Sequence, residues 1–124
     1  MRPCLLCNSN VHRTAHHCMI CHRCSAYFDH HCKYLNNCIG GKNYHTFIRL
    51  LVVVTIFCIF IIGQGIWIFV FTDWDTNFNS KIISRWGVLA SIIFTFIMMF
   101  TVDTLLCFHF YLLFVLKKST LAYL

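Results

Sequence analysis

The apolar residues of this chain are concentrated in two long runs in its second part. Residues 50–72 contain 23 positions without a charged side chain, and residues 86–116 contain Asp103 as their only aspartate, glutamate, lysine or arginine. A helix needs roughly 20 apolar residues to cross the hydrocarbon core of a bilayer. The pattern therefore predicts two transmembrane helices, of which the second is long enough to tilt.

The first 47 residues are polar by comparison and follow no helical period. They hold seven of the nine cysteines and seven of the eight histidines, and Gly40 and Gly41 form a turn near their end. A segment of this size and polarity cannot build an apolar core, and such segments usually depend on disulfides or metal ions. We therefore expect irregular loops and short β-hairpins that a covalent or metal link holds together.

Zinc is the expected link, with disulfides as the less favoured alternative. The cysteines occur in C-x2-C pairs with histidines between them, which is the usual spacing of tetrahedral zinc ligands. No internal repeat is evident beyond these pairs. The predicted fold class is an α-helical integral membrane protein in which a small zinc-stapled cysteine-rich domain precedes two transmembrane helices. The expected boundaries are 1–47 for the cysteine-rich domain, 48–72 for the first helix, 73–85 for a short luminal or extracellular loop, 86–116 for the second helix and 117–124 for a cytosolic tail.

Composition and charge agree with a membrane protein. Hydrophobic residues make up 59% of the chain and charged residues only 11%, which is unusual for a soluble domain. The formal net charge is +6, but the basic residues are scattered, so we expect a lipid bilayer and no nucleic acid as partner. Six lysines and arginines precede the first apolar run and two follow the second, whereas the two between the runs are balanced by two aspartates. The positive-inside rule therefore places both termini and the zinc domain in the cytosol. A multi-pass protein of an endomembrane or the plasma membrane is expected.

Asp103, Cys58 and Cys107 are polar or reactive residues within the apolar runs. Asp103 is costly in hydrocarbon, so it should face a partner helix, a water-filled cavity or the headgroups, and a structural and a functional role are equally supported. Cys58 and Cys107 are expected to be small buried apolar residues.

Eight cysteines and histidines of the first part have the spacing of metal ligands. Two closed sites of three cysteines and one histidine each would use all eight, and a closed tetrahedral site is structural because it leaves no position for water or substrate. Spacing alone does not decide which ligand belongs to which ion, and His12, His16, His22 and Cys32 are alternative ligands. The eight candidates are Cys4, Cys7, His17, Cys18, Cys21, Cys24, His31 and Cys38.

The stretch from Cys4 to Phe47 resembles the cysteine-rich domain of DHHC-type protein S-acyltransferases, the palmitoyltransferases. It matches C-x2-C-x9-H-C-x2-C-x2-C-x4-D-H-H-C-x5-C, followed by Ile39-Gly40 and Asn43-x3-Phe47. The resemblance implies two structural Zn²⁺ ions with interleaved ligand sets, namely Cys4, Cys7, His17 and Cys24 for one ion, and Cys18, Cys21, His31 and Cys38 for the other.

With those ligands assigned, Cys32 is the free thiol of the Asp29-His30-His31-Cys32 motif. A neighbouring base activates a thiol for attack on a thioester, so His30 is the expected base and Asp29 the residue that orients it. The resemblance implies that Cys32 takes a long acyl chain from acyl-CoA, such as palmitoyl-CoA, and passes it to a cysteine of a membrane or peripheral protein substrate. The alternative is that Cys32 is a spare zinc ligand and that Asp29 and His30 are a hydrogen-bonded pair behind the metal site.

The family usually has four membrane helices, with this domain between the second and the third. The present order of parts resembles the domain and the last two helices, so association with itself or with relatives is expected to complete the bundle. A second hypothesis is a non-catalytic zinc-stapled membrane adaptor or a truncated fragment that binds partners without acyl transfer. The chain departs from the family pattern at Lys33-Tyr34, at residues 11–14 and at residues 119–122.

Overall fold

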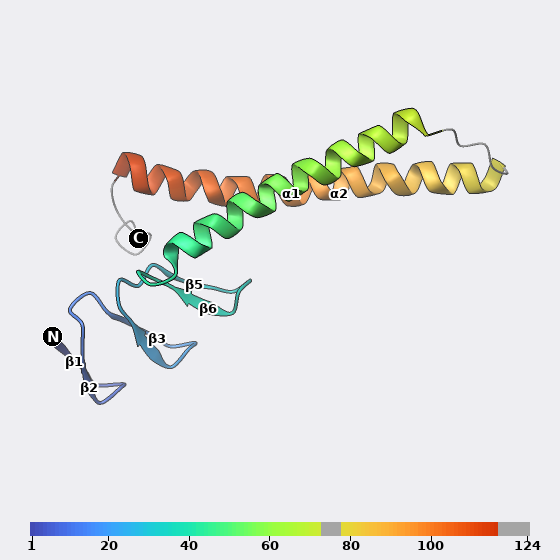
Figure 1. Ribbon diagram of the computed structural model, residues 1–124. Helices are drawn as coiled ribbons and strands as arrows, with labels where there is room; N and C mark the ends of the chain where they lie inside the picture. Colours follow the sequence, from blue (N-terminus) through green and yellow to red (C-terminus); the bar gives the residue numbers. More distant parts are fainter. Residues whose placement is uncertain (73–77, 117–124) are drawn as a thin grey trace. The chain divides into compact units, whose positions relative to one another are not determined.

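The computed structural model describes residues 1–72 and 78–116, without the side chains of residues 78–83 and 116. Within these residues, three short hairpins precede two long helices and a π-helical segment (Figure 1). The predicted fold class, with short β-hairpins in the cysteine-rich part and two long apolar helices, is confirmed. The elements are β1 (Arg2–Cys4), β2 (Ser9–Val11), β3 (His16–Cys18), β4 (Arg23–Ser25), β5 (His30–Cys32), β6 (Asn37–Ile39), α1 (Tyr44–Phe71), α2 (Phe78–Phe110) and η1 (Tyr111–Leu116).

The three hairpins repeat one structural unit with an offset of 14 residues. β1 pairs with β2, β3 with β4 and β5 with β6, each antiparallel and in the same register. The last residue of each turn is left-handed: φ is 48° at Asn8, 49° at His22 and 47° at Asn36. Asparagine and histidine are among the residues that adopt this conformation most readily. The expectation of no repeat beyond the cysteine pairs was therefore wrong, because strand pairing, turn geometry and the positions of cysteines and histidines all recur at this offset.

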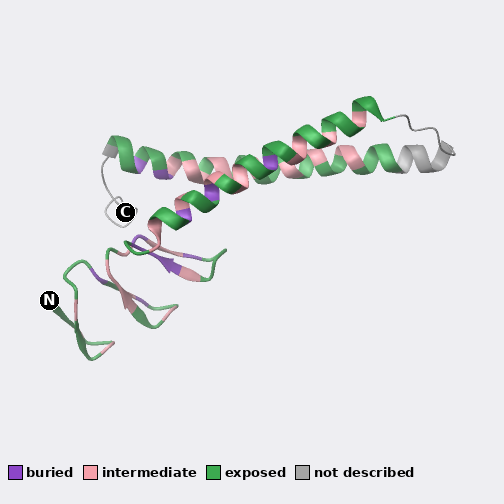
Figure 2. Cartoon of the chain, viewed as in Figure 1, coloured by how far each residue is buried: buried purple, intermediate pink, exposed green. Residues whose placement is uncertain are grey.

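Burial increases from the first hairpin to the third (Figure 2). β1 and β2 are almost entirely exposed, whereas β6 contains the buried Cys38 and Ile39. Strands of three residues bury few side chains, so each hairpin needs support beyond its own backbone hydrogen bonds. The structure agrees here with the expectation that this segment has no sizeable apolar core.

The described chain divides into two compact units. The first contains Met1–Arg49 and the segment that begins at Phe108, and the second contains Leu50–Cys107. The largest fully buried side chains all belong to the first unit; they are Ile39, His109 and Leu112. Its small core therefore combines the third hairpin with residues far along the sequence.

The turn after β6 packs against the second hairpin. The amide of Gly41 donates a hydrogen bond to the carbonyl oxygen of Ala26, at 3.3 Å. A Cβ atom on Gly40 would lie 3.0 Å from that same oxygen, which is too close for ordinary packing. A side chain at residue 40 would therefore require the neighbouring atoms to shift by a few tenths of an ångström.

Asn43 fixes the start of helix α1. Its side-chain oxygen accepts a hydrogen bond from the amide of Gly40, and its side-chain nitrogen donates one to the carbonyl oxygen of Cys38, both at 2.9 Å. Its carbonyl oxygen accepts the helical bond from the Phe47 amide. Asparagine is a preferred residue at this capping position. The helix consequently begins at Tyr44, four residues before the start at residue 48 that hydropathy predicts.

Both helices are long and apolar enough to cross a membrane, over Tyr44–Phe71 and Ser84–Val115. The second helix begins at Phe78, eight residues before the predicted start at residue 86. A helix can continue past the apolar run that sets a sequence-based boundary, so hydropathy does not locate its end. The first part of the predicted 73–85 loop, residues 73–77, lies outside the described residues, as does the predicted tail 117–124.

Polar and small residues bring the two helices together within the second unit. Thr55 donates a hydrogen bond of 2.6 Å to the Asp103 carboxylate, so Asp103 faces the partner helix, one of its three expected environments. A Cβ atom on Gly65 would lie 2.7 Å from a side-chain carbon of Ile92, which marks a close approach between the helices. Cys58 is buried as expected, but Cys107 is exposed, so the prediction for Cys107 was wrong.

Replacing Asn43 by alanine should loosen the joint between β6 and α1. The change removes the acceptor for the Gly40 amide and the donor to Cys38, at a cost of about 1–3 kcal/mol of local stability. Amide hydrogen exchange should show lower protection of Gly40. Asn43→Asp is the matched control, because it keeps the acceptor for Gly40 and loses only the donor. Unchanged protection of Gly40 in the alanine variant would contradict the capping role.

Candidate metal centres and active site

Four side chains of the first two hairpins converge on one point. Cys4 and Cys7 come from the β1–β2 hairpin, and His17 and Cys24 are paired opposite each other in β3 and β4. The Nδ1 atom of His17 lies 3.1 Å from the sulfur of Cys7, 3.7 Å from that of Cys24 and 3.8 Å from that of Cys4. The sulfurs of Cys7 and Cys24 are 3.6 Å apart.

The next pair of hairpins repeats this arrangement. Cys18 and Cys21 come from the second hairpin, and His31 and Cys38 are paired opposite each other in β5 and β6. The Nδ1 atom of His31 lies 3.3 Å from the sulfur of Cys21, 3.7 Å from that of Cys18 and 4.0 Å from that of Cys38. In each group all four ligand atoms lie within 4.8 Å of one another.

These distances and donor types fit zinc. With the usual Zn–S and Zn–N bond lengths, the edges of a tetrahedral site are about 3.6–3.8 Å long, close to the separations of the two groups. Thiolates and imidazole are ligands that zinc prefers. None of the nine cysteines, all of which lie in the described residues, forms a disulfide. The two cysteine and histidine groups can therefore hold zinc, and each leaves no ligand position open.

Clustered thiols resist joint ionisation. Desolvation, together with the neighbouring Cys4 and Cys7 side chains, raises the pKa of Cys24 to about 12. Desolvation and the neighbouring Cys21 and Cys18 side chains likewise raise the pKa of Cys38 to about 12. A divalent cation offsets this repulsion, because metal binding favours the thiolate form of its ligands.

The two groups contain the same residues as the two ligand sets that the resemblance implies. The alternative ligands lie elsewhere. His12 accepts a hydrogen bond from the amide of Thr14, His16 packs on the ring of Phe28, and His22 occupies a left-handed turn position. The second hairpin contributes two ligand atoms to each group, so it connects the first hairpin to the third.

Strand β5 separates the possible metal ligand His31 from His30 and Cys32. Side chains alternate between the two faces of a strand, so His30 and Cys32 share one face and His31 has the other. His31 belongs to the second four-residue group, whereas Cys32 belongs to neither group. Cys32 is buried, with 6% of its surface exposed.

The hairpin repeat gives Cys32 a structural equivalent in each of the other hairpins. Cys4, Cys18 and Cys32 are the last residues of β1, β3 and β5. Three residues further on, the first two hairpins have Cys7 and Cys21, but the third has Leu35. The third hairpin thus keeps the first cysteine of the pair and lacks the second, which leaves Cys32 without a neighbouring thiol at C-x2-C spacing.

Asp29 and His30, which precede Cys32 in the same motif, form a hydrogen-bonded pair. The Nδ1 atom of His30 lies 2.8 Å from a carboxylate oxygen of Asp29, whose side chain is almost fully buried. The Asp29 amide donates a hydrogen bond to the carbonyl oxygen of Ile39, which fixes the carboxylate relative to β6. With Nδ1 engaged, Nε2 is the nitrogen of His30 that is available for proton transfer.

His109 also belongs to this site, although the sequence analysis did not select it. One nitrogen of His109, one nitrogen of His30 and one oxygen of Asp29 lie within 4.8 Å of one another. His109 is 1% exposed and is hydrogen-bonded to the Tyr44 hydroxyl at 2.9 Å. The available signal was a lone histidine in an apolar run, since polar residues in such runs are costly and usually have a partner.

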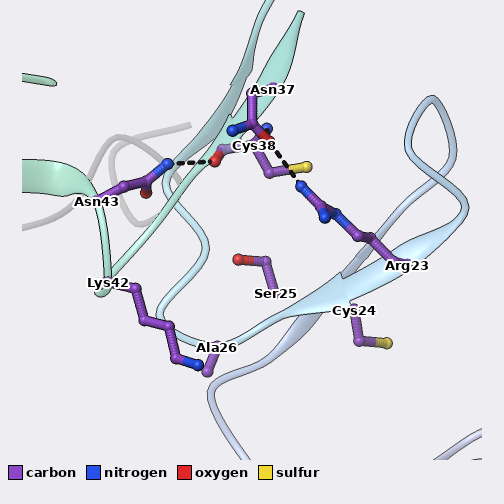
Figure 3. Close-up of a pocket in the computed structure, with 8 residues that line it drawn as sticks. All are labelled: Arg23, Cys24, Ser25, Ala26, Asn37, Cys38, Lys42 and Asn43. Atoms are coloured by element: carbon purple, nitrogen blue, oxygen red, sulfur yellow. Dashed lines mark hydrogen bonds between the residues drawn. The ribbon is translucent and has the colours of Figure 1, made fainter.

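A separate polar cavity of about 450 Å³ lies between the second and third hairpins (Figure 3). Arg23 and Lys42 supply positive charge to its wall, and Arg23 donates a hydrogen bond of 2.6 Å to Asn37. Cys32 and His30 do not line it. The cavity is therefore distinct from the Asp29, His30 and Cys32 site.

Comparison with known proteins identifies the family. The chain matches the family model of the DHHC palmitoyltransferase over residues 1–123, and it therefore belongs to this family. It is 37% identical over 102 residues to "Probable protein S-acyltransferase 5" of Arabidopsis thaliana, a match covering 80% of this chain and 21% of that protein. It is also 37% identical over 93 residues to "Palmitoyltransferase pfa3" of Emericella nidulans, covering 74% of this chain and 18% of that protein.

A third relative is "Probable protein S-acyltransferase 7" of Arabidopsis thaliana, 32% identical over 100 residues, covering 78% of this chain and 22% of that protein. The chain spans about a fifth of the length of the curated relatives that it matches. Family membership and the two apolar helices together indicate a membrane protein.

Removing one histidine ligand should remove one zinc ion. Elemental analysis of the purified chain should give two zinc ions in the wild type and about one in His17→Ala or His31→Ala, because closed sites depend on all four ligands. His16→Ala is the matched control, since His16 is adjacent to His17 and belongs to neither group. Two retained zinc ions in both ligand variants would rule out the proposed sites.

Proposed function

We propose that this chain contains the catalytic centre of a protein S-acyltransferase and that Cys32 carries the acyl group. One observation carries the proposal: His30, which is hydrogen-bonded to Asp29, lies in the same strand as Cys32, a thiol that belongs to neither four-ligand group. Membership of the DHHC palmitoyltransferase family supports the same reaction class, and so do the printed names of the relatives.

In the first step, Cys32 is the nucleophile. His30 accepts the thiol proton at Nε2, and the resulting thiolate attacks the thioester carbonyl carbon of acyl-CoA. The bond from that carbon to the Cys32 sulfur forms, and the bond to the CoA sulfur breaks. The CoA thiolate then takes the proton from His30. Asp29 holds the imidazole in one orientation and stabilises its protonated form during the transfer.

In the second step, the acyl group moves to a cysteine of a protein substrate. His30 accepts the proton of the incoming thiol, the new thioester forms, and Cys32 leaves as a thiolate that recovers the proton. Each step exchanges one thioester for another, so little driving force is needed from bond energies. Placement of the two sulfurs and of the carbonyl carbon is then the main requirement.

The eight ligand residues have a structural role in this proposal. Cys4, Cys7, His17 and Cys24 hold one zinc ion, and Cys18, Cys21, His31 and Cys38 hold the other. Bound zinc supplies rigidity, because neither group keeps a position for water or substrate. His31 ties β5 to the second group and so fixes the strand on which His30 and Cys32 lie.

The two parts of the acyl donor prefer different solvents. CoA is soluble in water, whereas its acyl chain favours hydrocarbon, so the reaction suits a site at the membrane surface. We place the cysteine-rich unit and both termini in the cytosol, on the basis of the positive-inside bias. Membrane-bound or peripheral proteins with accessible cysteines are the substrates.

The acyl-enzyme is directly testable. The purified chain, incubated with labelled palmitoyl-CoA, should acquire a label that hydroxylamine removes and that Cys32→Ser lacks, since only a thioester is cleaved readily by hydroxylamine. Cys107→Ser is the matched control, because Cys107 is exposed and lies outside the site. Cys32→Ser should keep two zinc ions. A label that persists in Cys32→Ser would exclude Cys32 as the carrier, and loss of a zinc ion would identify it as a ligand.

A further inference from the structure

We propose that His109 is a positioning residue that holds the imidazole of His30 in its reactive orientation, with Tyr44 holding His109 in turn. This inference rests on the proposed acyltransferase function and adds to it two residues from the ends of the long helices. Tyr44 is the first residue of α1, and His109 is next to the last residue of α2. All of these residues belong to the same compact unit.

The surroundings of His109 restrict it to one orientation. Its side chain is almost fully buried, and its Nδ1 atom is hydrogen-bonded to the Tyr44 hydroxyl at 2.9 Å. α2 gives way to the π-helical segment η1 immediately after Phe110, and Leu112 in that segment has no exposed surface. π-Helical turns are frequent at functional sites. The end of α2 is thus anchored where His109 enters the site.

The ring of His109 lies against the ring of His30. Their centroids are 5.7 Å apart, with an angle of 37° between the planes. Phe47 contacts both rings edge to face, with centroid distances of 5.4 Å to His30 and 5.2 Å to His109. Phe47 and His109 therefore form two sides of the space that His30 occupies.

The packing of Phe47 and His109 restrains the tilt of the His30 ring, which the hydrogen bond to Asp29 leaves free. A single hydrogen bond at Nδ1 fixes one point of the imidazole but permits the ring to tilt about that bond. The neighbouring rings of Phe47 and His109 block the tilt, so Nε2 keeps one direction. A small misplacement of a catalytic group lowers rates strongly, by roughly a hundredfold for 1 Å.

A metal site at Asp29, His30 and His109 would account for fewer of the observed contacts than a hydrogen-bonded arrangement does. The Asp29 oxygen is already 2.8 Å from Nδ1 of His30, which is a hydrogen-bond distance between two of the supposed ligands. Nδ1 of His109 is likewise engaged by the Tyr44 hydroxyl. Both imidazoles thus have the partners of an oriented hydrogen-bonded group.

Two variants remove the hydrogen bond between Tyr44 and His109 and keep an aromatic ring at both positions. His109→Phe keeps a ring beside His30 but removes the bond to Tyr44, and Tyr44→Phe removes only the hydroxyl. In the full chain in detergent, each should slow acylation of Cys32 by palmitoyl-CoA by roughly tenfold to a hundredfold, with KM for palmitoyl-CoA unchanged. His45→Phe and Tyr111→Phe are matched controls, because His45 and Tyr111 are exposed, and both should retain the wild-type rate.

A double-mutant cycle tests whether His109 acts through His30. His109→Phe should have little further effect in a His30→Ala background, because residues that act as a unit give non-additive losses. Zinc content and helical circular dichroism should match the wild type in every variant. An equal loss in both backgrounds, or wild-type rates in His109→Phe and Tyr44→Phe, would overturn the inference.

A second measurement keeps this inference separate from the proposed function. The rate at which iodoacetamide alkylates Cys32, followed by peptide mass spectrometry, depends on His30 and needs no acyl donor. His109→Phe and Tyr44→Phe should lower it by a similar factor. A wild type that does not acylate, but whose alkylation responds to these changes, would refute the acyltransferase and keep the inference. A wild type that acylates, with neither rate changed by the variants, would support the acyltransferase and refute the positioning role of His109.

Discussion

Three sulfurs and one imidazole nitrogen converge in each of two groups, and the rest of this structure depends on that constraint. Hairpins with strands of three residues bury too little to be stable alone, and only the third has a substantial buried surface. Because the second hairpin shares its ligand residues between both groups, the three hairpins are joined in series. The rigidity of β5 then follows from contacts at His31 and Cys38.

The alternation of side chains along β5 gives its two faces different tasks. One face is occupied by His31 and the proposed metal site, and the other presents His30 and Cys32. Structural and chemical requirements therefore act on neighbouring residues without competing for them.

Much of this organisation could be predicted from the sequence, because ligand spacing and hydropathy are local signals. The C-x2-C pairs indicated metal binding, and the two apolar runs indicated the helices. The hairpin repeat was missed although cysteines and histidines recur in the sequence at its 14-residue offset. The left-handed turns at Asn8, His22 and Asn36 became evident only in the structure. The start of α1 was placed late because the cap at Asn43 sets it. His109 was missed because its contact with His30 joins residues distant in sequence, which no spacing pattern reports.

The difference between Leu35 and its counterparts Cys7 and Cys21 has a consequence for the lifetime of the protein. The third hairpin folds with the same strand register and the same turn as the other two, although its first cysteine belongs to neither four-ligand group. In the proposed reaction Cys32 gains and loses an acyl group, and none of the eight converging ligand atoms belongs to it. Under that proposal, repeated acylation leaves the metal-binding scaffold intact, so chemical damage to the Cys32 sulfur is uncoupled from unfolding.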